Sequence, residues 1–165
     1  MAIPDRRFTF DLPRRNATLA DALAAAIDRP RRPTPRQVLD HFLNVAAVDR
    51  VQAWRGEIDP DALTPDHTKA DAQIKAERVA QTDFYQDTHC WVFTPLSFAT
   101  ICAGLAELGH LPFACADLYP TEYLDLEFFV AMRPARDPAD AIDTWRTMTR
   151  RLREIGPLSA PLAHH

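Results

Sequence analysis

Glycine is scarce in this chain of 165 residues, which has only four, at positions 56, 104, 109 and 156. No GxGxxG or GxGxG pattern can be written with these spacings. The chain therefore lacks the glycine-rich loop through which backbone amides approach a phosphate or a nucleotide closely. Serine occurs only as Ser97 and Ser159, and neither lies in a GxSxG motif, so a serine hydrolase is not expected.

Cysteine is also infrequent, and the three cysteines cannot all pair with one another. Cys90, Cys102 and Cys115 are odd in number and form no CxxC motif. This pattern argues against a disulfide framework and favours a reducing, cytoplasmic location. The N-terminal segment MAIPDRRFTF places charges where a signal peptide needs an apolar core, so secretion is not expected.

The chain has neither an excess of positive charge nor a long apolar run. Its net charge is −4, so no global field attracts it to nucleic acid or to an anionic membrane. The most apolar region, 98–116, is interrupted by charged residues, glycine and proline, so it is not expected to span a membrane. Residues 1–36 carry eight arginines against four aspartates, and residues 57–87 carry eight acidic against three basic residues. We interpret both regions as solvated faces or as partners in intramolecular ion pairs.

Proline is abundant, with 14 residues, and it predicts where helices begin. Thr34-Pro35, Thr64-Pro65 and Thr94-Pro95 each place a threonine that can cap free amides before a proline that suits the first helical position. Together with the spacing of the apolar residues, they predict helices over 18–28, from 35 to about Gly56, over 65–81 and over 95–108.

The C-terminal third changes its periodicity. Residues 111–118 and 124–132 alternate as strands do, and the turn at 119–122 predicts that they pair as an antiparallel hairpin. A last helix is expected over 138–155 with Asp137 as its cap, followed by a frayed tail after Gly156. The sequence thus predicts an α+β fold, mostly helical, with a C-terminal antiparallel β-hairpin.

A cluster of chemically active side chains, Asp87-Thr-His-Cys90, precedes the Thr94-Pro95 pair. His89 and Cys90 are adjacent, so in an extended segment they point to opposite sides and do not share a metal ion. Cys90 is interpreted as a buried structural thiol, because no base or positive setting for a nucleophile is evident. Asp87 and His89 are left as polar groups that could face a pocket.

His41 and His67 are the other histidines near helices. His41 precedes the inward-facing Phe42, which predicts a half-buried, hydrogen-bonded histidine, with proton transfer as the alternative. Asp66 and His67 are expected in the first turn of their helix, where Asp66 favours the dipole. Nothing in the sequence requires the histidines to converge, so no metal site is predicted.

Two separate phrases and the hairpin resemble part of a known family. The phrase "AIPDRRFTFD" is similar to the end of the fifth strand and the following loop of bacterial class I S-adenosylmethionine-dependent methyltransferases, and "DTHCWVFTP" is similar to a later phrase of the same proteins. The resemblance equates 18–86 with a helical insertion, and 95–133 with a helix and the sixth and seventh strands. It covers about residues 1–133 and leaves 134–165 as an extra helix and tail.

The resemblance implies a substrate-side role. Asp5, Arg6 and Arg7, with Asp87 and His89, match regions that tend to face the substrate in such enzymes. His89, Asp87 and His41 are the candidate catalytic residues, and Asp5, Arg7 and His89 the candidate substrate-side residues. The cofactor-binding half has no counterpart in these residues, so no cofactor-binding residue is assigned, and S-adenosylmethionine is implied only for a complete family enzyme.

Three functions follow as hypotheses. The first is the C-terminal part of a methyltransferase for an unidentified small-molecule acceptor, which is not expected to be competent alone. It would be either a truncated gene product or a piece that works with a separate cofactor-binding half. The second is a non-enzymatic interaction module that buries an open sheet edge by forming a homo-oligomer, unless the C-terminal helix covers that edge. The third and least favoured is a self-contained enzyme that uses His41, His67 or His89.

Overall fold

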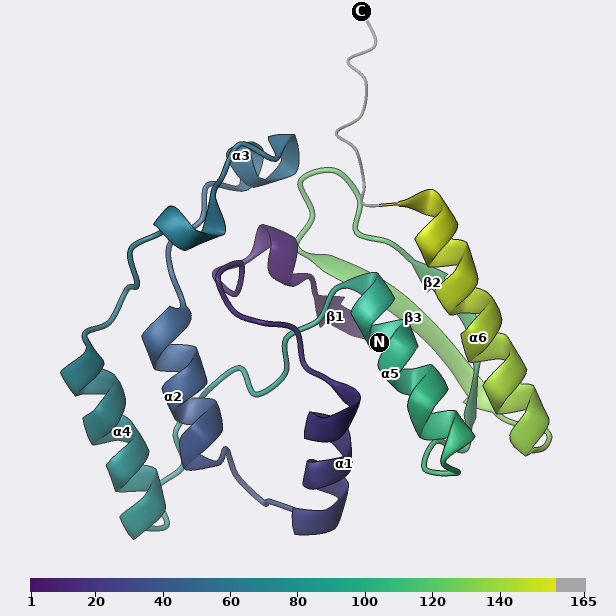
Figure 1. The fold of residues 1–165 in the computed structure, drawn as a ribbon, viewed down its shortest axis with the longest axis horizontal. Helices are drawn as coiled ribbons and strands as arrows, with labels where there is room; N and C mark the ends of the chain where they lie inside the picture. The colour runs from purple at the N-terminus through teal and green to yellow at the C-terminus, as the bar shows by residue number, and fades with distance from the viewer. Residues whose placement is uncertain (157–165) are drawn as a thin grey trace, which may run out of the picture.

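The computed structural model describes residues 1–156, and the predicted frayed tail after Gly156 lies outside them. The described chain has the predicted α+β fold, with a small antiparallel sheet, the last two helices against one face of it and the other helices beside them (Figure 1). Its elements are β1 (Ala2–Pro4), α1 (Leu19–Asp28), α2 (Pro35–Asn44), α3 (Arg50–Arg55), α4 (Lys69–Gln81), α5 (Pro95–Glu107), β2 (Phe113–Tyr119), β3 (Glu127–Pro134) and α6 (Pro138–Ile155), with short 3-10 turns at Arg6–Phe8 and Pro60–Ala62. None of the described helices is long and apolar enough to cross a membrane.

The predicted hairpin is confirmed, and a third strand joins it. β2 and β3 pair antiparallel, and β1 pairs antiparallel with the other side of β3, so the strand order is β1-β3-β2. Residues far apart in sequence therefore lie in one row across the sheet, with Ala2 and Tyr119 on either side of Phe129.

One face of this sheet forms the main core. Helices α5 and α6 lie side by side against it (Figure 1), and small residues of α5, including Ala99 and Ala106, allow close approach. Trp145 of α6 is fully buried there, and its indole Nε1 donates a hydrogen bond to the Phe113 carbonyl at 2.9 Å. The opposite face is open, because Phe129 and Tyr119 keep 49% and 56% of their surface exposed.

The two outer edges of the sheet differ in the groups that limit pairing with a further strand. The Cys115 amide of β2 donates to the Thr144 hydroxyl of α6 at 3.1 Å, and a bulge lies between Cys115 and Asp117. The C-terminal helix thus binds one backbone amide on the β2 side of the sheet. The β1 edge is short and carries Pro4, which has no N–H to offer to a further strand.

A second core lies between α2 and α4, apart from the sheet (Figure 1). It contains Val38 and Phe42 of α2 and Ala72, Ala76 and Val79 of α4. The predicted caps Thr34 and Thr94 are confirmed, and each forms a capping box with the residue three positions later.

Two predicted helix boundaries were wrong. The helix expected from 35 to about Gly56 is divided into α2 and α3, because the chain leaves the helix at Val45 and Asp49 caps a new start. Helix α4 begins after Thr68, not at Thr64-Pro65, because the Thr68 hydroxyl accepts from the Asp71 amide at 3.1 Å. Asp66 therefore precedes the helix, and its carboxylate accepts from the Ala47 amide of another loop.

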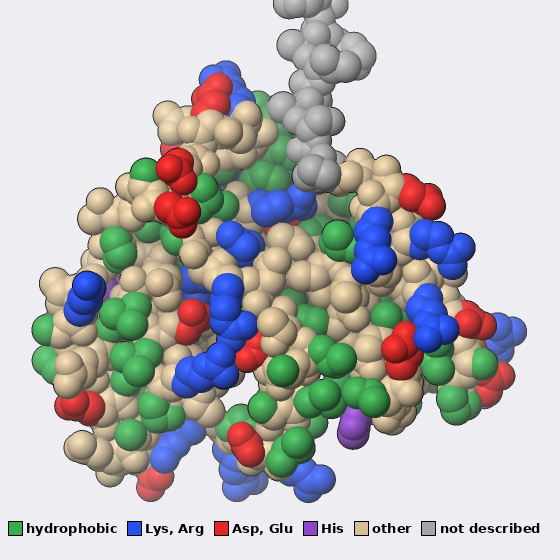
Figure 2. Space-filling model, viewed as in Figure 1, with side chains coloured by type: hydrophobic (Ala, Val, Ile, Leu, Met, Phe, Trp, Pro, Cys, Tyr) green, Lys and Arg blue, Asp and Glu red, His purple; other side chains and the backbone are tan. Residues whose placement is uncertain are grey.

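Charged side chains of both signs are interspersed over the surface (Figure 2). The arginine-rich region 1–36 and the acidic region 57–87 are joined by one ion pair, as expected, since a guanidinium nitrogen of Arg32 lies 3.2 Å from Asp83 Oδ1. Asp21 pairs with both Arg15 and Arg36 within the first region. The local charge asymmetry of the sequence is thus in part an intramolecular pairing.

Candidate functional site

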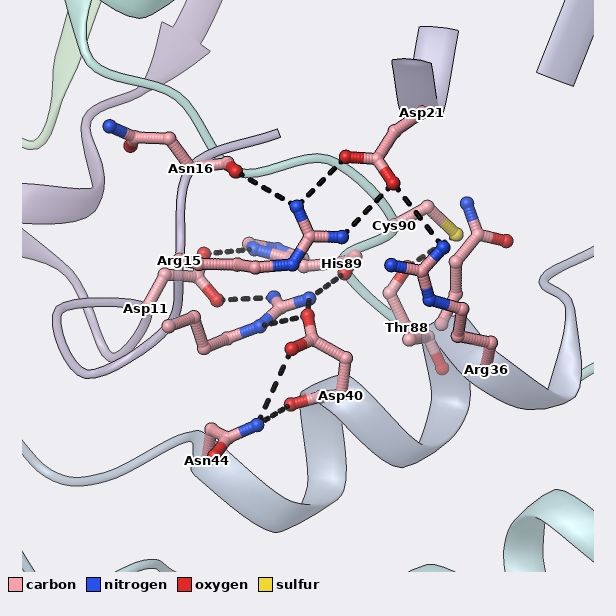
Figure 3. A network of polar contacts seen from close by, with 12 residues as sticks. Asp11, Arg15, Asn16, Asp21, Arg36, Asp40, Asn44, Thr88, His89 and Cys90 are labelled. Carbon is pink, nitrogen blue, oxygen red and sulfur yellow. Dashed lines mark hydrogen bonds and ion pairs between the residues drawn. The ribbon is translucent and has the colours of Figure 1, made fainter. Parts of the chain in front are cut away.

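A buried arginine joins the segment after β1 to two distant parts of the chain. The Arg14 side chain is 1% exposed and makes four hydrogen bonds (Figure 3). It donates to Asp11 Oδ1 at 2.6 Å, to Asp40 Oδ2 of α2 at 2.6 Å and to the His89 carbonyl at 2.9 Å. Because a guanidinium presents fixed, planar donors, this contact sets the position of Asp11 and of the segment that carries His89.

His89 and Asp11 form a hydrogen-bonded pair. His89 Nδ1 lies 2.9 Å from Asp11 Oδ2, and the carboxylate is 2% exposed while the imidazole side chain is 41% exposed. With Nδ1 engaged by a buried carboxylate, Nε2 is the nitrogen available to a ligand. Burial works against ionisation of Asp11, but hydrogen bonds from His89 and Arg14 outweigh it and lower the pKa of Asp11.

The same pairing makes His89 a stronger base. The hydrogen bond to Asp11 raises the pKa of His89 above its ordinary value of 6.5, although partial burial acts in the opposite direction. A histidine held in one tautomer by a carboxylate, with its other nitrogen accessible, is suited to accept a proton. Thus the candidate catalytic residue His89 has a partner, Asp11, that the sequence interpretation did not include.

His41 lies close to this pair but behaves differently. Its ring centroid is 6.0 Å from that of His89, and Phe10 touches both rings. Burial, assisted by the charge of Arg14, lowers the pKa of His41 to about 4. Its Nδ1 is buried without a hydrogen-bond partner among the described residues, so the hydrogen bond predicted for this half-buried histidine is not found at that atom. His41 is neutral at physiological pH.

A surface cavity of about 630 Å³ lies in front of His89. It is bordered by the end of β1, the start of α3 and the β2–β3 turn, and its lining residues are Pro4, Thr9, Phe10, Arg50, His89, Leu124, Asp125, Leu126, Glu127 and Phe129. Segments far apart in the sequence therefore line one cavity together with this imidazole.

The other predicted substrate-side residues do not line this cavity. Asp5 has no exposed surface, and it holds Arg7 at 2.6 Å and the Thr121 hydroxyl at 2.7 Å. Arg7 borders a separate cavity of about 300 Å³ at the start of α5. Asp87 is exposed and lies outside the lining of the cavity in front of His89. Asp5 thus joins Arg7 to Thr121 inside the fold. Of the candidate residues, only His89 lines the cavity of about 630 Å³.

The remaining candidates carry no further chemistry. Cys90 is half-buried and not buried as predicted, because the segment that carries it lies at the surface. Partial burial raises the pKa of Cys90, so its side chain is a thiol and not a thiolate, and its Sγ lies 3.5 Å from the Thr88 carbonyl. His67 packs its ring against Phe42 at a centroid distance of 4.8 Å. Within residues 1–156, no group of three histidine, cysteine or acidic side chains could hold a metal ion.

The pairing of His89 with Asp11 predicts a specific pH titration. We expect the His89 imidazole to titrate above 6.5 and His41 near 4, and we expect Asp11→Asn to lower the pKa of His89, because the anionic partner is lost. NMR titration of the histidine ring signals measures both values, with Asp87→Asn as the comparison, in which only the smaller charge effect of Asp87 is lost and the pKa of His89 falls less. Protonated His89 stabilises the fold below the pKa of the unfolded histidine, and this contribution disappears as pH rises through the folded pKa. An unchanged pKa in Asp11→Asn would contradict the pairing.

No protein-family model, no curated protein and no solved structure matches this chain.

Proposed function

We propose that this chain is the acceptor-side part of a class I S-adenosylmethionine-dependent methyltransferase, with His89 as the base that deprotonates the acceptor. The observation that supports it is the placement of the segments identified by resemblance. The segment equated with a fifth strand pairs as β1 with β3, and the segments equated with the sixth and seventh strands complete the same sheet. His89 lies beside the end of β1, where the Asp5–Phe93 bridge brings the second phrase of the resemblance against the first.

The described residues do not fit the cofactor. Gly56 and Gly156 end helices, and Gly104 packs against Leu19 inside α5. Gly109 follows α5 in a turn, so none of the four stands between a strand and the start of a helix, where a nucleotide could approach backbone amides. We therefore assign S-adenosylmethionine to a separate polypeptide portion and derive no step through it.

The chain's own contribution is proton acceptance. A hydroxyl or amine of the acceptor in the cavity donates its proton to neutral Nε2 of His89, and the Asp11 carboxylate stabilises the imidazolium that forms. Arg14 holds Asp11 in place through its hydrogen bond to Oδ1. General-base catalysis of this kind contributes a factor of about 10²–10⁴ in rate. The rate should accordingly rise with pH through the raised pKa of His89, since only the neutral imidazole accepts a proton.

A second candidate function is favoured by the open face of the sheet. The row formed by Ala2, Phe129 and Tyr119 is apolar and uncovered, and such faces commonly bind other protein surfaces. This observation supports the interaction module of the second hypothesis, with the sheet face as the contact surface in place of the short β1 edge.

Calorimetric titration with S-adenosylmethionine, together with the oligomeric mass, tests the proposal. The purified chain should give no binding heat, and the chain co-expressed with the product of the adjacent upstream coding sequence should bind the cofactor. In that assembly, His89→Ala should keep cofactor binding and lose at least about 10²-fold in transfer rate, as expected for loss of a general base. His110→Ala, a change at an exposed histidine outside the cavity, is the control.

Three outcomes would overturn it. If the chain alone binds the cofactor, the assignment of the cofactor site to a separate polypeptide portion is wrong. If the assembly with His89→Ala transfers the methyl group at the full rate, His89 is not the base. A stable homodimer that binds no cofactor in either preparation would favour the interaction module.

A further inference from the structure

The cavity in front of His89 presents charged groups of both signs. Arg50, Asp125 and Glu127 all line it. None of these three side chains forms an ion pair with another side chain within residues 1–156, although Arg50 donates to the Leu124 carbonyl at 3.1 Å. The cavity therefore offers unused donors and unused acceptors together, with one guanidinium and two carboxylates in its lining.

Aromatic rings form the apolar part of the same wall. Phe10 is 39% exposed and its ring lies 4.7 Å from that of His89, while Phe129 presents its ring from the open face of β3. Exposed aromatic faces next to fixed polar groups are suited to a ligand whose one face is apolar and whose edge is polar.

The turn that carries the acceptors has a strained backbone. Leu124 has a φ of 67°, in the left-handed region that residues with a Cβ rarely adopt. The hydrogen bonds from Arg50 to the Leu124 carbonyl and from the Asp125 amide to the Glu122 carbonyl hold this conformation. Strain of this kind is found most often where a side chain or a backbone group must be placed for binding. Here it places Asp125 at the rim of the cavity.

We propose that this cavity binds a neutral polyhydroxylated ring, a sugar or a closely similar polyol, as the acceptor of the proposed reaction. A hydroxyl is both a donor and an acceptor, so one ring can accept from Arg50 and donate to Asp125 and Glu127. Its C–H face packs against Phe10 and Phe129. One hydroxyl faces His89 Nε2, to which it gives its proton. This inference rests on the proposed function only for that last step, because binding of the sugar needs the cavity alone.

The charge balance favours this ligand over two others. An organic anion would meet Arg50 and protonated His89, but also the carboxylates of Asp125 and Glu127, which repel it. A purely apolar ligand would bury these charged groups without partners, which is unfavourable. A neutral ring with several hydroxyls can form hydrogen bonds both with Arg50 and with the two carboxylates.

Titration of the isotope-labelled chain with sugars, followed by amide NMR shifts, tests the inference. The probes are glucose, galactose, mannose and N-acetylglucosamine with their disaccharides, compared with glucuronate, glucose 6-phosphate and benzyl alcohol. We expect at least one neutral sugar to shift the amides of residues 9–10, 50, 89 and 124–129. Asp125→Ala and Glu127→Ala should each weaken it about tenfold, the loss of one good hydrogen bond to a charged group. Glu122→Ala, in the same turn but outside the cavity lining, should bind normally.

The outcomes separate the ligand class from the proposed function. If glucuronate or glucose 6-phosphate binds as tightly as the neutral sugars, the cavity is an anion site and the inference is wrong. It is also wrong if benzyl alcohol alone binds, or if no sugar shifts the cavity amides. In each case the cofactor titration of the assembled protein still decides the methyltransferase proposal. Signal dispersion in the same spectra shows that each variant is folded.

Discussion

Arg14→Ala is expected to lower the free energy of unfolding by about 3–5 kcal/mol, the usual cost of removing one partner from a buried ion pair. The substitution leaves Asp11, which is 2% exposed, without its guanidinium and removes the donor to Asp40 Oδ2 and to the His89 carbonyl. It also removes one of the contacts that join α2 to the segment after β1. Urea unfolding, with intrinsic tryptophan fluorescence as the signal, measures the change.

Two further variants make the Arg14 result specific. Arg14→Lys should recover only a small part of the loss, because an ammonium cannot serve both carboxylates and the carbonyl in one plane. Arg15→Ala, in the neighbouring exposed pair with Asp21, should cost less than about 1 kcal/mol. An Arg14→Ala protein as stable as Arg15→Ala would show that the buried network does not stabilise the fold.

Trp145→Ala should be comparably destabilising, by about 3–5 kcal/mol. Trp145 is fully buried between α5 and the sheet, its ring meets Phe98, and its Nε1–H satisfies the Phe113 carbonyl. The alanine variant creates a large cavity in the main core and removes the donor on which one backbone group of β2 depends. Thermal and urea unfolding measure the change.

The matched controls divide this effect into packing and hydrogen bonding. Trp145→Phe keeps much of the packing and should cost less, about 1–3 kcal/mol, mainly through the unpaired carbonyl. Trp91→Ala removes the same side chain from a position that is 39% exposed and should change stability much less. Equal losses in Trp145→Ala and Trp91→Ala would argue against Trp145 as the centre of the core.

The helix starts that follow local rules were predictable from the sequence, and the others were not. Thr34, Thr94 and Asp137 each cap a helix whose apolar residues agree with it, and all three are confirmed. At Thr64-Pro65 the same local signal competes with Thr68, and the tertiary contact of Asp66 with the Ala47 amide accompanies the later start. The break between α2 and α3 likewise depends on a distant group, since the Ala46 amide donates to the Phe10 carbonyl.

Part of the candidate site was also predictable. His89 stood out because it precedes a capped helix in an extended segment. Asp11 and Arg14 were missed because their contacts with residue 89 span 78 and 75 residues of sequence, and no periodicity records such a contact. Their spacing of three residues, in a loop that contains Pro13, was the one available signal. Arg50 was missed because the predicted continuous helix placed it in the interior of that helix and not at the start of α3.

The pairing of β1 with β3 has a consequence for synthesis of the chain on the ribosome. Met1 and Val130 are joined by backbone hydrogen bonds although 129 residues separate them. At ordinary rates of elongation, β1 has left the ribosome on the order of ten seconds before its partner strand exists. During that time Ile3 and its neighbours have no sheet to join, and the hairpin, once made, closes locally and first. The first of these three strands to be made is therefore among the last to be fixed, and until it pairs, β3 of the closed hairpin keeps one unpaired edge that a chaperone could bind.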